Sequence, residues 1–209
     1  MQRFILAILA AGLGLAGSAH AQRAAGTSLP SSRWVVNGHS TAALGTSVGD
    51  EFGSLDTRAG LGGGVEIGYR ITPRLLAYAG ADIAKQEINE VGLAGDFGLT
   101  HLEAGARLSF PTSSRILPYV GAWVGRRSLT TTVENFDTGE IFDLSLSGLG
   151  FGASAGIQYF VSPVLALDGG LSVGMGKMGN VKVDGRAQDW GTPDNTTTTR
   201  IRFGANWYP

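Results

Sequence analysis

The sequence predicts an all-β protein, an eight-stranded antiparallel up-and-down transmembrane β-barrel. The first observation is alternation: from Gly148 to Val161 every second position is apolar, and the positions between are mostly glycine. A period of two over this length is typical of a strand whose two faces meet different surroundings. The second is an export segment at the N-terminus, and the third is a regular succession of long and short connections between strands. Because glycine weakens a strand unless a close neighbour needs the space, the glycine face is expected to line a crowded interior.

The first 21 residues have the features of a secretory signal peptide. Arg3 supplies the basic start, residues 4–16 are apolar, and Ala19-His20-Ala21 forms a small-residue cleavage site. The alternatives, a membrane anchor or a buried helix, are disfavoured because the run is short for a membrane span. We therefore expect a signal peptide over residues 1–21, a flexible lead over 22–32 and one barrel domain over 33–209.

Composition narrows the class of protein. The chain has no cysteine, so an exported protein of this kind must be held by packing and hydrogen bonds rather than disulfides. Its net charge of −1 gives no reason to expect nucleic acid binding. No later segment has about 18 consecutive apolar residues, so no transmembrane helix is expected after the signal.

Eight segments show the two-residue period. They are residues 33–44, 60–71, 75–84, 99–110, 116–129, 148–161, a strand from Leu165 and a last strand from Arg200. In the fifth, both faces carry apolar residues; we interpret Val124 as outward, with Tyr119, Trp123 and Arg127 inward. Short turns at residues 72–74, 111–115 and 162–163 alternate with longer acidic loops, including 134–143 and 178–196. Bacterial outer-membrane barrels have this layout, with short periplasmic turns and longer outer loops.

Aromatic residues collect near the short turns, where a membrane barrel has an interfacial girdle. We expect this girdle to consist of Trp34, Tyr69, Phe110, Tyr119, Tyr159, Phe160, Trp207 and Tyr208.

The chain resembles the eight-stranded outer-membrane barrels typified by the OmpA transmembrane domain and OmpX. The resemblance is architectural, and it includes the Pro-Tyr-Val-Gly-Ala stretch at 118–122 and the closing strand. Arg202, Gly204 and Trp207 fit the family's C-terminal assembly signal, although Pro209 stands where an aromatic residue is usual. The resemblance implies recognition by the outer-membrane assembly machinery and location in the outer membrane.

The interior faces carry acids and bases in similar numbers. We predict a lumen charge network formed by Glu66, Arg70, Asp82, Glu103, Arg107, Asp168, Arg200 and Arg202. An eight-stranded barrel is only wide enough to be filled by its own side chains, and buried charges must be paired. A network that packs the lumen is therefore favoured over a gated path for solutes.

No catalytic motif is found. His101, Glu103 and Ser109 could be assembled into a hydrolase site, but the serine and histidine motifs of barrel lipases and deacylases are not recognised here. Only His39 and His101 follow the signal segment, and no histidine or cysteine cluster indicates a metal site. The acidic loops match no defined calcium loop. The expectation is a protein without enzymatic activity, metal or cofactor.

The predicted function is that of a small outer-membrane barrel with a packed polar lumen and a structural or surface-interaction role through four outer loops. Expected partners are outer-membrane lipid, lipopolysaccharide, the assembly machinery and an extracellular ligand that the loops do not specify. A small-solute channel of low conductance is the alternative. A secreted lipocalin-like binder is less consistent with the sequence, because its interior should be apolar.

Overall fold

The computed structural model describes residues 30–48, 55–56, 59–87, 96–134, 141–188 and 194–209. The predicted signal segment, residues 1–21, lies outside this part of the chain, as do residues 22–29 of the predicted lead. Among the described residues, no helix has the length and apolar character needed to cross a membrane.

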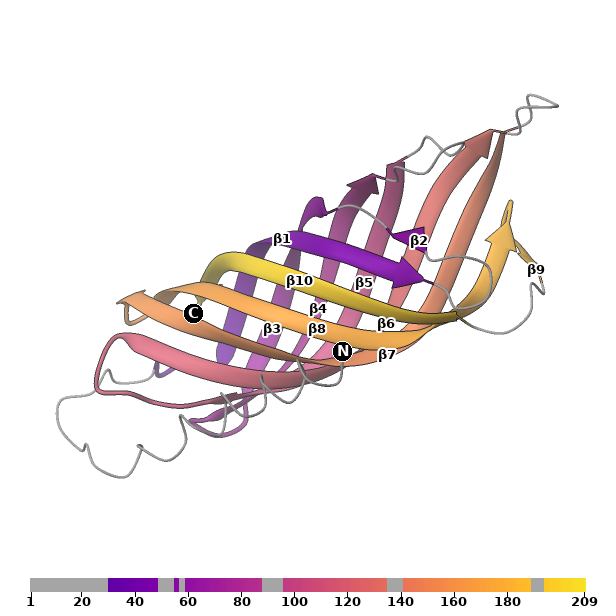
Figure 1. The fold of residues 1–209 in the computed structure, drawn as a ribbon. Helices are drawn as coiled ribbons and strands as arrows, with labels where there is room; N and C mark the ends of the chain where they lie inside the picture. The colour runs from indigo at the N-terminus through magenta and orange to yellow at the C-terminus, as the bar shows by residue number, and fades with distance from the viewer. Residues whose placement is uncertain (1–29, 49–54, 57–58, 88–95, 135–140, 189–193) are drawn as a thin grey trace.

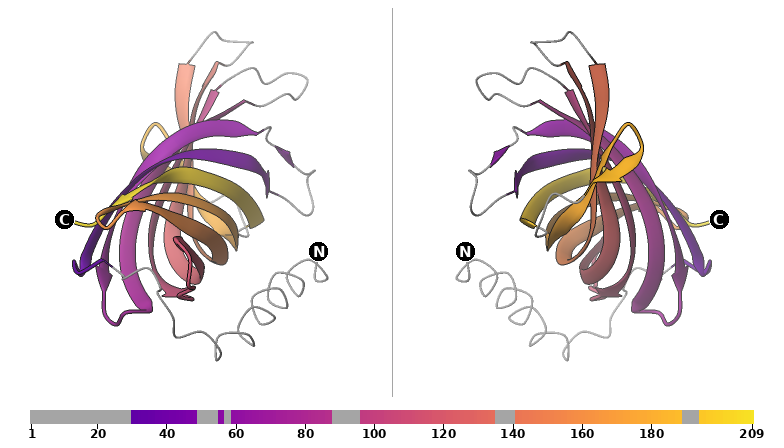
Figure 2. Two further views of the ribbon diagram at one scale, coloured as in Figure 1. Left: turned by 90° about the vertical axis from the view of Figure 1, so that its left-hand side faces the viewer. Right: turned by 90° about the vertical axis from the view of Figure 1, so that its right-hand side faces the viewer.

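The described chain forms one antiparallel sheet that closes into a barrel (Figures 1 and 2). Its strands are β1 (Trp34–Val48), β2 (Leu55–Asp56), β3 (Gly60–Arg70), β4 (Leu75–Glu87), β5 (Asp96–Ser109), β6 (Ile116–Glu134), β7 (Ile141–Ser162), β8 (Leu165–Val183), β9 (Arg186–Gln188) and β10 (Asp194–Trp207). Eight of them form the wall, and β2 and β9 are short additions to β1 and β8. Each wall strand pairs with the next along the chain, and β10 pairs with both β8 and β1. The predicted fold class is confirmed.

Several strands are longer than predicted at the end opposite the short turns. Glu134 and Asp143 were assigned to a loop, but β6 and β7 pair along their length up to Glu134 opposite Ile141. The predicted loop from Met178 to Thr196 is also wrong in part. The chain continues as β8, turns at Asp184 and Gly185, returns as β9, and enters β10 at Asp194. Both turn residues have positive φ, 48° and 76°, which is typical of a two-residue hairpin turn.

The outer face of the barrel is apolar. Large apolar side chains remain exposed on every wall strand, for example Leu61 at 77% and Leu149 at 74%. Soluble monomers rarely expose apolar surface on this scale, whereas a lipid-facing wall requires it. The predicted orientation of β6 is correct: Val124 is exposed, while Tyr119, Trp123 and Arg127 are buried inside.

The aromatic girdle is only partly as predicted. Trp34, Tyr159 and Trp207 are exposed on the outer face, and Trp34 packs edge-on against Tyr69 with ring centroids 5.0 Å apart. Tyr119, Phe160 and Tyr208 are instead buried in the lumen. The girdle assignment was wrong for these three, and for Tyr119 the inward orientation predicted for β6 is the correct one, because nearness to a short turn does not decide which face of the wall a side chain occupies.

Candidate functional site: the packed lumen

The glycine face of β7 and β8 accommodates large side chains from β6. Gly152 and Gly174 are neighbours in register, and a Cβ built on either would meet the Trp123 ring. Gly156 and Gly170 receive Tyr119 in the same way. The absence of side chains on this face therefore lets the rings approach the wall closely, which is the close approach that the alternation predicted.

The centre of the lumen is an ion-pair network in which two arginines join two acids. Arg200 Nη1 donates to Asp82 Oδ2 at 3.1 Å, and its Nη2 donates to Glu103 Oε2 at 2.8 Å. Arg202 Nη2 is 2.8 Å from both Asp82 Oδ2 and Glu103 Oε1. All four side chains are buried, the acids come from β4 and β5, and both cations come from β10.

A third acid extends the network toward the short turns. Arg107 Nη2 donates to Glu66 Oε2 at 2.5 Å, and Arg202 Nη1 lies 3.8 Å from the same oxygen. The Arg107 guanidinium also stacks between two rings, 4.5 Å from the centroid of Tyr78 and 5.0 Å from that of Tyr119. Cation–π contacts of this kind stabilise a desolvated guanidinium beyond its ion pair.

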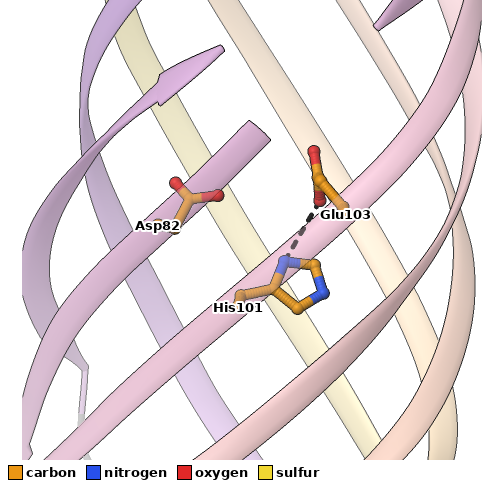
Figure 3. Close-up of side chains that lie close together, drawn as sticks. All are labelled: Asp82, His101 and Glu103. Atoms are coloured by element: carbon orange, nitrogen blue, oxygen red, sulfur yellow. Dashed lines mark ion pairs between the residues drawn. The ribbon is translucent and has the colours of Figure 1, made fainter. Parts of the chain in front are cut away.

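The two histidines of the described residues, His39 and His101, join the network. His39 Nε2 lies 2.6 Å from Asp82 Oδ1, and its Nδ1 lies 2.6 Å from Asn37 Oδ1. His101 Nδ1 is 3.1 Å from Glu103 Oε2, as Figure 3 shows, and 2.6 Å from Arg200 Nη1. Because a guanidinium can only donate, His101 Nδ1 accepts from Arg200. Neither side chain was part of the predicted charge network, since alternation alone gives no partners.

Asp82, His101 and Glu103 also have the composition of a metal site. One ligand atom from each lies within 4.8 Å of the others. Both carboxylates, however, are already in contact with Arg200 and Arg202. Two guanidinium groups thus provide the positive charge that a metal ion would bring, and these residues do not fit a metal centre.

Two predicted members of the network lie outside it. Arg70 donates to the Pro30 carbonyl oxygen at 2.7 Å and lies 5.2 Å from the centroid of the Tyr208 ring. Asp168 accepts hydrogen bonds from Tyr119 Oη at 3.1 Å and from Asn206 Nδ2 at 3.0 Å. Both belong to the end of the lumen near the short turns. The structure therefore brings together Glu66, Asp82, Glu103, Arg107, Arg200 and Arg202 of the predicted set.

Arg127 is a further buried cation. It is 2% exposed, donates to Thr198 Oγ1 at 3.2 Å, and lies 5.8 Å from the centroid of the Trp123 ring. Its Nη2 packs against Gly150 and has no hydrogen-bond partner among the described residues. Sequence alternation placed Arg127 inside but gave no indication that it would be separated from the acids.

Two apolar clusters enclose the network. Toward the short turns, five buried side chains pack with Leu76: Val35, Leu117, Phe160, Ala166 and Tyr208. Toward the long loops, four buried side chains pack with Leu146: Ala84, Leu99, Leu129 and Met178. The charged layer is therefore bounded by an apolar layer on each side along the barrel axis.

A closed barrel with an apolar exterior and a packed, charged interior is a transmembrane β-barrel of the filled kind. Residues 7–208 match the family model described as "Outer membrane protein beta-barrel domain", and the chain belongs to this family of outer-membrane proteins.

The solved structures give the same fold. Neisserial surface protein A is similar with a TM-score of 0.61 and 23% identity, over 85% of this chain and 98% of that chain. Ail, the attachment invasion locus protein of Yersinia pestis, gives a TM-score of 0.51 and 14% identity over 84% of this chain and 98% of that one. OprG from Pseudomonas aeruginosa gives a TM-score of 0.52 and 11% identity, over 86% of this chain and 96% of that chain. No curated protein matches the sequence significantly.

Proposed function

We propose that this protein is a filled, non-conducting and non-catalytic barrel that holds a surface-interaction platform outside the membrane. The proposal that the barrel is filled and does not conduct rests on the layers of side chains in the lumen. Ions would have to pass two apolar clusters and a layer in which guanidinium and carboxylate groups are already in contact. A pore at this position would require the core of the barrel to come apart.

Single-channel recording tests this proposal. The purified protein in a planar bilayer should give no steady current, while a wide porin in the same apparatus gives the reference for an open lumen. Large and stable single-channel currents would contradict the packed-lumen proposal and favour the alternative, a small-solute channel lined by the same arginines and acids.

The surface-interaction role rests on the ends of β6 and β7 that extend beyond the lipid-facing band, which we call the ridge. Figure 1 shows β6 and β7 extending past their neighbours at the long-loop end. Arg126 is the first charged side chain on the outer face of β6, and the strand continues eight residues further to Glu134. At ~3.3 Å per residue and a ~45° tilt, this extension is about 19 Å high.

The ridge is held by hydrogen bonds in addition to the strand ladder. Thr132 Oγ1 donates to Asp143 Oδ1 at 2.9 Å, and the Asp143 amide donates to Asp184 Oδ1 at 3.0 Å. A sheet fixed in this way offers a partner a preformed surface, which lowers the ordering cost of binding. The names of Neisserial surface protein A and of the attachment invasion locus protein are consistent with such a surface role.

A shortened ridge tests the surface role. Replacing residues 131–143 by a two-residue turn should leave a folded barrel, because the described residues of this segment, 131–134 and 141–143, lie beyond both apolar clusters. It should abolish binding of the cells that express it to host cells or matrix. Retained adhesion by the shortened protein would contradict the platform role without affecting the packed-lumen proposal.

We further propose that assembly machinery and outer-membrane lipid are partners. Of the three residues in the predicted assembly signal, Trp207 is exposed, whereas Arg202 is buried in the lumen and Gly204 packs against His39. The three can be read together only before the barrel closes. Replacing Trp207 with Ser should therefore slow assembly in cells more than it changes the stability of the finished barrel, and equal effects would contradict the signal.

A further inference from the structure

An open groove of about 1150 Å³ runs across the outer wall over β4 to β8. Its floor is low because Ala79 and Ala104 are opposite each other in register and carry only methyl groups. Leu102, Leu149 and Phe151 project from the wall beside this floor. The wall is thus low at this point, and the larger side chains beside it bound an apolar groove.

Two cations stand at one end of this groove. Arg126 on β6 and Lys177 on β8 are both opposite Leu149 of β7, so they flank it on the two sides. Two strand spacings place their backbones about 9.5 Å apart, a span that two long side chains can close on one anionic group. Both are exposed, and Arg126 Nη2 donates to Ser147 Oγ at 3.1 Å, which orients the guanidinium.

The depth of these cations in the membrane follows from the strand. Strand β6 begins with Ile116 at the short-turn end, and Arg126 lies ten residues further along it. At ~3.3 Å per residue and a ~45° tilt this is about 23 Å, close to the ~25 Å height of the apolar band of such barrels. Arg126 and Lys177 therefore lie at the outer interface, and the groove extends from them down the lipid face toward the middle of the membrane.

The electrostatics of the groove favour an anion. Among its lining residues the one acid is Glu103, which faces the lumen and is neutralised by Arg200 and Arg202. Behind the floor, the Arg127 guanidinium packs against Gly150 and Gly176, which also line the groove. Two exposed cations thus lie at one end of the groove, and a third is buried behind the wall at Gly150 and Gly176.

We propose that this groove binds a phosphorylated glycolipid of the outer leaflet, of the lipopolysaccharide type. Its phosphate lies between Arg126 and Lys177, and an acyl chain lies over Ala79 and Ala104. Phospholipids of the inner leaflet have their headgroups at the opposite interface, out of reach of both side chains. The inference is independent of the surface role proposed above, because binding is a property of the purified barrel.

Native mass spectrometry of the purified, lipid-depleted barrel titrated with lipid A measures this directly. The wild type should retain one lipid A per barrel. The double variant Arg126→Ser/Lys177→Ser should weaken retention about 30-fold. Lys85→Ser is the matched control, since Lys85 is also exposed near the outer interface, on β4, but does not line the groove. It should stay within twofold of the wild type.

Further measurements distinguish binding in this groove from nonspecific attraction of the lipid to positive charge. Ala104→Phe fills the floor while leaving both cations in place, and it should also weaken retention. Phosphatidylglycerol should compete poorly with lipid A, and removing the phosphates of lipid A should abolish retention. The proposal is overturned if the double variant retains lipid A like the wild type, if Lys85→Ser loses it equally, or if phosphatidylglycerol competes as well as lipid A. A heat-modifiability gel for each variant confirms that the barrel has folded.

Discussion

Replacing Gly174 with Ala tests whether the glycine face is a packing surface. A Cβ at this position would lie against the six-membered ring of Trp123. The ring has little freedom to move, because Trp123 Nε1 donates to Ser172 Oγ at 2.9 Å and the ring packs edge-on against His101 with centroids 4.8 Å apart. Inserting a methyl group into a packed core typically costs ~1–3 kcal/mol, and we expect Gly174→Ala to destabilise the barrel by that amount.

The same strand supplies a matched control. A Cβ at Gly169 would meet only a Phe203 carbon at 3.8 Å, which is ordinary van der Waals contact on the outer face. Because alanine loses less backbone entropy than glycine in a strand, Gly169→Ala should be neutral or stabilising by about 0.5–1 kcal/mol. Urea unfolding in lipid vesicles, followed by circular dichroism, gives both free energies. Equal effects at the two positions would refute the packing argument.

A double-mutant cycle identifies the partner. In a Trp123→Leu background the smaller side chain leaves room for the added methyl, so Gly174→Ala should cost little there. The coupling free energy between the two sites should then be ~1–3 kcal/mol. A coupling near zero would mean that the clash lies elsewhere than on the Trp123 ring.

Three other outcomes are expected. Ala153→Arg places a charge near the middle of the lipid face and should cost ~2–4 kcal/mol in a vesicle unfolding titration, where a negligible loss would mean that the two faces are reversed. Arg200→Met leaves two buried carboxylates short of a cation and should destabilise by ~3–5 kcal/mol, whereas Arg70→Met at the rim should cost about 1 kcal/mol; equal losses would contradict the network described here. An epitope inserted after Gly185 should be labelled on intact cells and one after Pro163 should not, and the converse would invert the topology.

Alternation was sufficient to predict the fold class, because a two-residue period and the order of turn lengths are local properties. It also placed Trp123 and Arg127 inside a strand where both faces looked apolar. Strand ends were harder to predict. After Leu129 the sequence continues with three threonines, which give no contrast in polarity between the two faces although the ladder continues. The Asp184-Gly185 hairpin did have a local signal, since this dipeptide between alternating residues is typical of a tight turn.

The candidate site was predictable in membership but not in pairing. Inward positions identified the acids and arginines, yet partners depend on stagger between strands far apart in sequence. Arg70 shares a face with Glu66, but its height near the short turn takes it to Pro30 and Tyr208 instead. The role of His39 also depends on a contact between strands, with Asp82 of β4. In both cases the partner of the side chain depends on its height along the barrel axis, which cannot be read directly from the sequence.

The distribution of charge between strands has a consequence for the order of events during insertion. Glu66, Asp82 and Glu103 lie on β3, β4 and β5, whereas Arg200 and Arg202 are both on the last strand. A nascent sheet that lacks β10 would carry these carboxylates with too few counter-charges, and such a sheet is costly to move into hydrocarbon. Arrival of the C-terminal strand completes the ladder and neutralises the interior in a single event. We therefore expect closure of the barrel and its entry into the membrane to be coupled.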